Sequence, residues 1–175
     1  MNSIKPIIFL LPVITLIITG ILFFTLLKKA QDKQTFKRYI FIVIVVSFLL
    51  NVVWELLQLP LYKNAVYNFN HIAFCALATV ADVLMVLLFY FALVLILKNL
   101  FWIQHIKLHQ VIIVVLIGGA GAVLSEMRHL SLGSWAFHDS MPIIPLVNVG
   151  ISPVLQFMLL PLLSYKLSYT YQKKS

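Results

Sequence analysis

Three of the five acidic residues in this chain, Glu55, Asp82 and Glu126, lie in stretches otherwise apolar enough to cross a lipid bilayer. A carboxylate at membrane depth costs at least ~2.5–3.5 kcal/mol, so each group must face a polar interior, bind a partner or stay protonated. Paired carboxyl groups in an apolar pocket can act as a general acid and a general base. The sequence therefore predicts an intramembrane polar site in which Glu55 and Glu126 are the catalytic pair and Asp82 adjusts them.

Further polar residues repeat near these acids at helical spacing. Asn51, Glu55 and Gln58 follow one another at i, i+4 and i+7, which places them on one face of a helix. His71 and Asp82 share a face of the next apolar stretch in the same way. We expect both faces to point into a bundle of helices, because lipid cannot satisfy their hydrogen bonds.

Depth along the predicted spans brings these groups together. Counted at about 1.5 Å per residue from the span ends, Glu55 and Glu126 both lie in the outer third of the bilayer, with Asp82 nearer the midplane. Gln156 enters from the outer side at a matching depth. The residues that we expect to line a substrate site are Asn51, Trp54, Gln58, His71, His129, Trp135, His138 and Gln156.

Other uses of the same residues are open. Glu126 and His129 have Glu-x-x-His spacing and could form a mononuclear zinc or iron site with Glu55, His71 and His138, but only one such motif is present, so no metal is predicted. The acids could instead bind a cation or polar solute in a small transporter. In a non-catalytic membrane subunit, the polar face would dock a partner helix. Nothing in the sequence identifies a cofactor.

Composition fixes the class of fold. Of the 175 residues, 62% are hydrophobic and 10% are charged, whereas a soluble domain has about 25% charged residues. The mean hydropathy is +1.04. The long continuous apolar runs predict a single all-α domain over residues 1–175, a multi-pass bundle of five transmembrane helices. We expect these helices at about residues 6–27, 39–62, 71–97, 111–130 and 150–168, the first being a retained span.

The cationic residues that give the net charge of +8 are concentrated in particular loops. Ten of the 13 cationic residues fall in the first loop, the third loop or the C-terminal tail, and three fall on the other side. This positive-inside bias predicts a cytoplasmic C-terminus and an external N-terminus in the plasma or inner membrane. The charge therefore indicates contact with the lipid bilayer rather than with nucleic acid. Trp102 is expected as an interfacial anchor, and the oligomeric state is not predicted.

Two further segments bear on the site. The outer segment 131–148 contains Trp135, Phe137 and two prolines, which fits either a re-entrant or lid-like segment over the bundle mouth or an ordinary interfacial loop. The stretch 118–125 carries small residues at every fourth position. Such spacing favours close packing against a neighbouring helix over a slot for a substrate.

The stretch from Glu126 through Gly133-Ser-Trp135-Ala-Phe137 to Pro153-Val-Leu-Gln156 resembles the membrane-embedded lycopene-cyclase-type domain. About 30 residues carry the resemblance: an acid near a helix end, a G-x-W-x-aromatic motif and a proline-led helix. Gln156 stands where the family pattern has glutamate. The resemblance implies isoprenoid chemistry by proton-initiated cyclisation or isomerisation on a lipid-soluble substrate.

Overall fold

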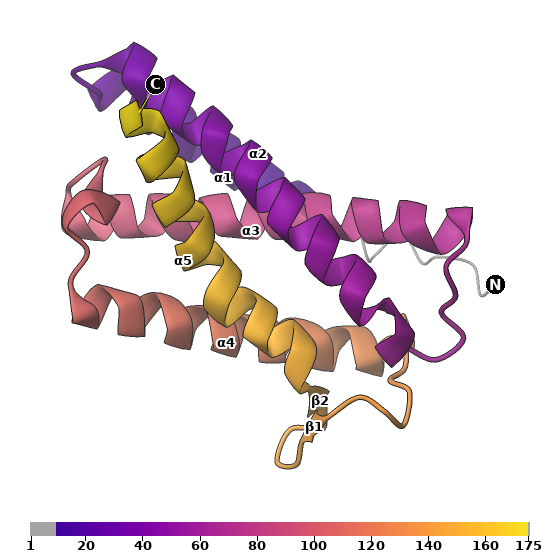
Figure 1. The fold of residues 1–175 in the computed structure, drawn as a ribbon. Helices are drawn as coiled ribbons and strands as arrows, with labels where there is room; N and C mark the ends of the chain where they lie inside the picture. Colours follow the sequence, from indigo (N-terminus) through magenta and orange to yellow (C-terminus); the bar gives the residue numbers. More distant parts are fainter. Residues whose placement is uncertain (1–9, 175) are drawn as a thin grey trace.

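The computed structural model describes residues 10–174, and its long elements are helices (Figure 1). Five of these helices are long and apolar enough to cross a membrane, which confirms the predicted all-α class and the number of spans. They are α1 (Leu10–Lys29), α2 (Lys33–Gln58), α3 (Phe69–Leu97), α4 (Leu108–Ser131) and α5 (Ile151–Lys174). Residues 6–9 of the first predicted span lie outside the described residues.

Two helix ends differ from the prediction. Helix α2 begins at Lys33 rather than near Tyr39, because Asp32 caps it: the Asp32 carboxylate accepts hydrogen bonds from the Thr35 backbone N–H at 2.9 Å and hydroxyl at 2.6 Å. Helix α5 continues to Lys174 rather than ending near Ser168, since nothing in its polar tail breaks a helix. Both extensions carry cationic residues beyond the apolar windows.

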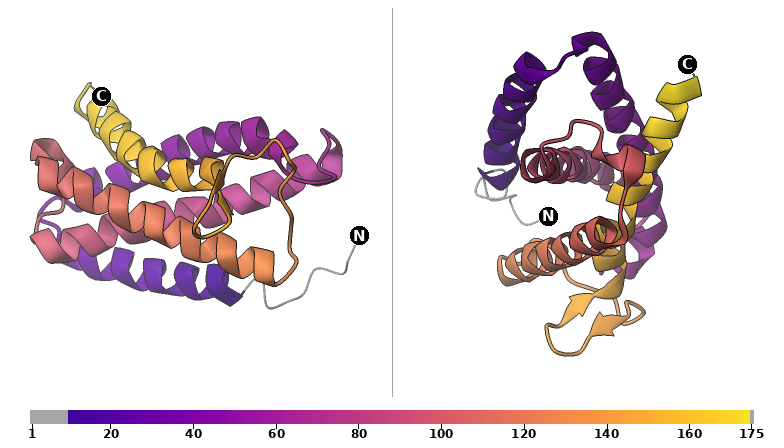
Figure 2. Two further views of the ribbon diagram at one scale, coloured as in Figure 1. Left: turned by 90° about the horizontal axis from the view of Figure 1, so that it is seen from below. Right: turned by 90° about the vertical axis from the view of Figure 1, so that its left-hand side faces the viewer.

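The helices cross rather than run in parallel. Helices α3 and α4 lie side by side in Figure 1, and α2 and α5 cross them obliquely. Helix α5 packs against both α2 and α4, and α1 lies at the edge of the bundle against α3 (Figure 2). The approach of α4 to α5 depends on glycine, because a Cβ atom at Gly118 would clash with the Phe157 carbonyl oxygen. Close helix packing thus accounts for the small-residue stretch.

One half of the bundle is filled by rings. The aromatic core consists of Tyr39, Tyr90, Phe101, Trp102 and Tyr165. Its hydroxyl groups donate to backbone carbonyls: Tyr165 Oη to Val86 O at 2.6 Å, and Tyr90 Oη to Leu100 O. Trp102 is 2% exposed, so it is no interfacial anchor. The short 3-10 helix η3 (Trp102–His105) turns its ring inward against Tyr90 and Tyr165.

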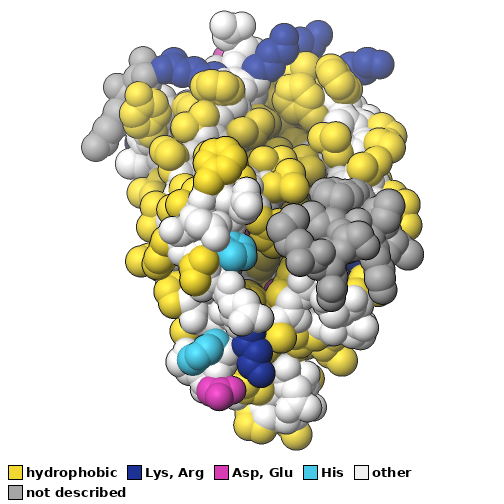
Figure 3. All heavy atoms as spheres, turned by 90° about the vertical axis from the view of Figure 1, so that its right-hand side faces the viewer, with side chains coloured by type: hydrophobic (Ala, Val, Ile, Leu, Met, Phe, Trp, Pro, Cys, Tyr) yellow, Lys and Arg dark blue, Asp and Glu magenta, His cyan; other side chains and the backbone are white. Residues whose placement is uncertain are grey.

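The segment 131–148 closes the opposite end. It contains the two-residue strand β1 (Ile143–Ile144), which pairs antiparallel with β2 (Val149–Gly150), directly after the segment. Backbone bonds join it to the end of α2, from Lys63 N to Ala136 O and from His138 N to Leu61 O, each at 2.8 Å. The segment is therefore held against the chain that directly follows α2. Figure 3 views this end, where hydrophobic side chains cover much of the surface.

Candidate functional site

A glutamine on α5 joins three helices at the centre of the polar half. The Gln156 amide nitrogen donates to Asn51 Oδ1 of α2 at 2.9 Å and to Asp82 Oδ2 of α3 at 3.0 Å. Its amide oxygen accepts a hydrogen bond from Gln58 Nε2 at 3.2 Å. Gln156 is 1% exposed, and both amide hydrogens are used. The side chain therefore fixes the relative positions of α2, α3 and α5.

The polar face of α2 points inward as its spacing predicts. Asn51 is 1% exposed and Gln58 is 3% exposed. Gln58 Nε2 also donates to Glu55 Oε1 at 2.7 Å, and Ser152 Oγ donates to Gln58 Oε1 at 2.9 Å. We call the set Asn51, Glu55, Gln58, Asp82, Ser152 and Gln156 the amide cluster. The side chains of the amide cluster hydrogen-bond to one another, whereas the hydroxyl groups of the aromatic core hydrogen-bond to backbone carbonyls.

Glu126 lies in a second group of side chains. Trp135 Nε1 donates to Glu126 Oε2 at 3.0 Å, and the Trp135 ring stacks on the His129 ring with 4.2 Å between centroids. The Tyr62 and Trp135 rings form a T-shaped contact, with 6.2 Å between their centroids. We call Tyr62, Glu126, His129 and Trp135 the indole site. Here a buried acid, 7% exposed, has an aromatic wall.

A turn after α4 creates the indole site. Gly133 has φ +66°, a left-handed conformation that glycine adopts without steric cost. The Ser134 N–H bonds to His129 O at 3.0 Å and the Gly133 N–H bonds to Leu130 O at 3.0 Å, the bond pair of a Schellman motif. The chain thereby reverses at the helix end and lays Trp135 back over α4.

Tyr62 connects the two groups. Burial raises the pKa of the Tyr62 hydroxyl, and the nearby Glu126, Glu55 and Asp82 carboxyl groups raise this pKa further. Tyr62 continues the α2 face that carries Glu55 and Gln58, and its ring contacts Trp135, the donor to Glu126. The hydrogen-bond donors to the three acids, the amides of Gln58 and Gln156 and the indole of Trp135, are all neutral.

Three of the expected site residues lie apart from the cluster. His71 Nδ1 contacts the Val66 carbonyl at 3.0 Å, and His138 is exposed and contacts Ser140 Oγ at 2.9 Å. Trp54 is half-buried, and its indole N–H has no hydrogen-bond partner in the part of the chain that the structure describes. Within residues 10–174, no three His, Cys, Asp or Glu side chains lie close enough to hold a metal ion.

Two contributors were not among the expected site residues. Ser152 and Tyr62 both lie at helix ends, at a depth where a serine or tyrosine is ordinary. Tyr62 does fall on the helical repeat of Asn51, Glu55 and Gln58, and that signal could have identified it. Ser152 also has a signal, because it lies one helical turn before Gln156 and enters from the outer side at a matching depth.

No protein-family model matches the sequence, and no curated protein or solved structure is significantly similar to it. The function therefore has to be inferred from the side chains themselves. The residues 10–174 form a multi-pass membrane protein with a buried, carboxyl-rich cluster between α2, α3, α4 and α5.

Proposed function

We propose that this chain is a membrane enzyme that carries out acid–base chemistry on a lipid-soluble, isoprenoid-like substrate. The observation that carries the proposal is that Glu55, Asp82 and Glu126 each accept a hydrogen bond from a neutral donor: the amides of Gln58 and Gln156 and the indole of Trp135. A carboxyl group held by a cation would be fixed as a structural ion pair. A group held by an amide or an indole remains free to gain or lose a proton.

The indole site supplies the acid and its aromatic wall. Glu126 is held by Trp135, whose ring stacks on His129 and contacts Tyr62 at nearly a right angle. Addition of a proton from Glu126 to an alkene carbon leaves a carbocation on the substrate. The faces of Trp135 and Tyr62 stabilise such a cation through their ring quadrupoles.

The amide cluster supplies the base. Loss of a proton from the carbocation to the Glu55 carboxylate forms a new alkene, so the net change is an isomerisation or cyclisation with no oxidant or reductant. Gln58 positions Glu55, and Gln156 positions Asp82. The resemblance to lycopene-cyclase-type domains supports this chemistry. Gln156 replaces the family's glutamate and cannot exchange a proton, so here it acts as a positioning residue.

The orientation and the membrane are part of the proposal. Most of the cationic residues lie at the helix ends and loops where α1 meets α2 and α3 meets α4, and in the C-terminal part of α5. The positive-inside rule then places these segments in the cytoplasm and the amide cluster in the outer half of the cell membrane.

The other two functions have less support from the geometry. A docking subunit would present Asn51 and Gln58 outward, but both are buried. A transporter needs a path through the bundle, and the fully buried rings of Tyr39, Tyr90 and Tyr165 lie between the amide cluster and the basic end. Within residues 10–174, the parts of the bundle on the two sides of this aromatic layer are not the paired structural halves that alternating-access transporters use.

Turnover in D₂O tests the proposal. The purified chain is reconstituted in liposomes that contain lycopene, an acyclic polyene, and the lipid extract is analysed by mass spectrometry. We expect an isomer or cyclised product that carries one deuterium from solvent. Glu126→Gln and Glu55→Gln should each abolish this product, and Asp139→Asn, an exposed acid outside the cluster, should not. Deuterium uptake that survives both glutamine variants would contradict the assignment.

A further inference from the structure

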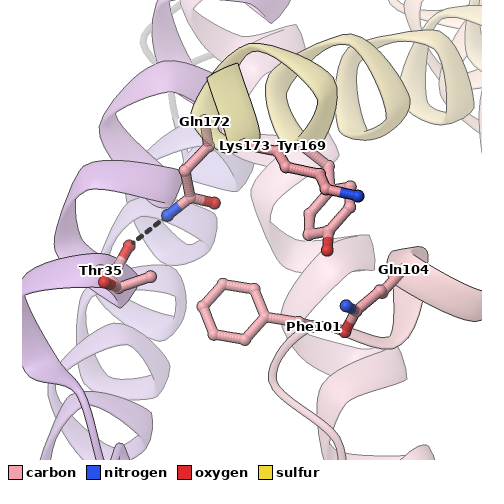
Figure 4. Close-up of a pocket in the computed structure, with 6 residues that line it drawn as sticks. All are labelled: Thr35, Phe101, Gln104, Tyr169, Gln172 and Lys173. Carbon is pink, nitrogen blue, oxygen red and sulfur yellow. Dashed lines mark hydrogen bonds between the residues drawn. The ribbon is translucent and has the colours of Figure 1, made fainter. Parts of the chain in front are cut away.

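A separate cavity of about 310 Å³ lies at the basic end of the bundle. Three elements form it: the first turn of α2, the segment around η3 and the last turns of α5 (Figure 4). Its lining residues are Thr35, Phe101, Gln104, Tyr169, Gln172 and Lys173. None of these belongs to the amide cluster or to the indole site, so the cavity is independent of the proposed chemistry.

The apolar and structural parts of the cavity are held in place. The Phe101 ring packs edge-on against the buried Tyr39 ring, with 5.6 Å between centroids. Gln172 Nε2 donates to the Thr35 carbonyl at 2.8 Å and ties α5 to α2 (Figure 4). These contacts form a rigid wall of the cavity. The bond that joins α5 to α2 uses the Gln172 amide nitrogen and not its amide oxygen.

The polar groups of the cavity suit an anion. Figure 4 shows the Lys173 amine, the Tyr169 hydroxyl and the Gln104 amide on one side of the space, with the Phe101 ring below. An ammonium group, a hydroxyl and an amide are all donors to phosphate oxygens. Asp32 is the nearest acid along α2, and its carboxylate is already bound by Thr35.

The position of the cavity indicates where the anion comes from. Thr35 is in the first turn of α2 and Lys173 is at the end of α5, so the cavity lies where the helices leave the apolar layer. Lys33 and Lys166, both exposed, lie within one helical turn of Thr35 and Tyr169. Basic pockets between helices on the cytoplasmic side bind anionic lipid headgroups.

We propose that this cavity binds the phosphate group of an anionic glycerophospholipid from the adjoining leaflet. Lys173, Tyr169 and Gln104 hold the phosphate, and Phe101 contacts the apolar part of the lipid. Two rings and one cation line the same open cavity, which distinguishes this site from the diffuse attraction of exposed lysines to a charged membrane.

Native mass spectrometry of the full chain in detergent micelles tests the proposal. The probes are dihexanoyl-phosphatidylglycerol, dihexanoyl-phosphatidylcholine and inorganic phosphate. We expect one retained phosphatidylglycerol per chain, weaker retention of phosphatidylcholine, and no displacement by an equal concentration of inorganic phosphate. Lys173→Gln and Gln104→Glu should each weaken phosphatidylglycerol retention about fivefold.

Lys28→Gln is the matched control, because Lys28 is an exposed cation at the same end but outside the cavity. It should leave retention unchanged. An equal loss in Lys28→Gln would overturn the site in favour of non-specific attraction. Equal retention of phosphatidylcholine would overturn the role of charge, and displacement by inorganic phosphate would show a soluble anion rather than a lipid as the ligand.

Discussion

The two halves of this bundle satisfy their buried polar groups in different ways. In the aromatic core, the hydroxyl groups of Tyr90 and Tyr165 donate to backbone carbonyls, which are fixed by the helices. In the amide cluster, side chains bond to side chains, as Gln156 does to Asn51 and Asp82. A backbone acceptor cannot change its charge, whereas a carboxyl group can. The aromatic half thus uses acceptors of fixed charge, whereas the polar half contains the groups on which the proposed chemistry depends.

The largest effect on stability is expected in the aromatic half. Tyr165→Ala removes a fully buried ring and its bond to Val86, and should lower the free energy of unfolding by roughly 3–5 kcal/mol. Steric-trapping measurements in bicelles can test this value. Leu57→Ala is the control, since Leu57 is 73% exposed on the outer face of α2 and should change stability by less than about 0.5 kcal/mol. Equal losses in the two variants would contradict the assignment of the core.

The contact between α4 and α5 links the two halves and comes next. Gly118→Ala places a methyl group against the Phe157 carbonyl and should cost about 1–3 kcal/mol of unfolding free energy. Gly20→Ala on α1 is a matched control, because a Cβ atom there meets nothing within 4 Å. Both variants are compared by thermal unfolding in micelles. Because alanine favours a helix more than glycine does, an equal destabilisation of Gly20→Ala would show that the loss does not come from the α4–α5 contact.

A smaller loss of stability is expected from the polar half. Gln156→Leu removes bonds to Asn51, Gln58 and Asp82, and intramembrane hydrogen bonds contribute about 0.6 kcal/mol each on average. The unfolding free energy should therefore fall by about 1–2 kcal/mol, with complete loss of isoprenoid turnover. Tyr165→Phe is the converse control, because it removes a hydroxyl bond from the aromatic core and should leave turnover unchanged. Full activity in Gln156→Leu would remove the functional distinction between the halves.

The smallest effect on stability is expected at Asp32, the N-cap of α2, which lies at the edge of the bundle. The hydroxyl and backbone N–H of Thr35 bond to the Asp32 carboxylate and hold its pKa below the ordinary value of 3.8. A lowered pKa in the folded state means that the stabilisation is complete above pH 3.8 and is lost as the pH falls through the folded value. Protection of the Thr35 amide against hydrogen exchange, taken relative to the intrinsic exchange rate at each pH, should therefore fall only below pH 3.8.

Asp32→Asn is the control for the cap, since asparagine also caps a helix but does not titrate in this range. Protection of the Thr35 amide in this variant should not depend on pH between 2 and 5, roughly the range in which aspartate titrates. A midpoint above pH 3.8 in the unmodified chain would contradict the capping geometry.

The sequence predicts some parts of the molecule better than others. The five spans follow from their apolar length, and the inward face of Asn51 and Gln58 follows from helical spacing. The aromatic core does not, because a buried tyrosine and a lipid-facing one look alike in an apolar stretch. Trp102 is the clearest example: its place beside basic residues suggests the interface, but η3 turns it inward.

The same limit applies within the candidate site. The depth of Gln156 predicts its contact with α2 and α3, because depth can be counted along each helix. The bond between Trp135 and Glu126 depends on the reversal at Gly133, a local backbone conformation that spacing along α4 does not contain. His71 and His138 bond to their own loops for the same reason. Local turns, rather than helix positions, decide which loop residues reach the site.

The central claim is that Glu55, Asp82 and Glu126 form one coupled group rather than three separate acids. Isotope-edited infrared spectroscopy of the carboxyl stretching bands tests it directly, with Glu55→Gln and Glu126→Gln compared with the unmodified chain in liposomes. We predict that removing either glutamate shifts the bands of the two acids that remain. If each glutamine variant only loses the carboxyl band of the substituted residue and the frequencies of the other carboxyl bands do not change, the account is contradicted.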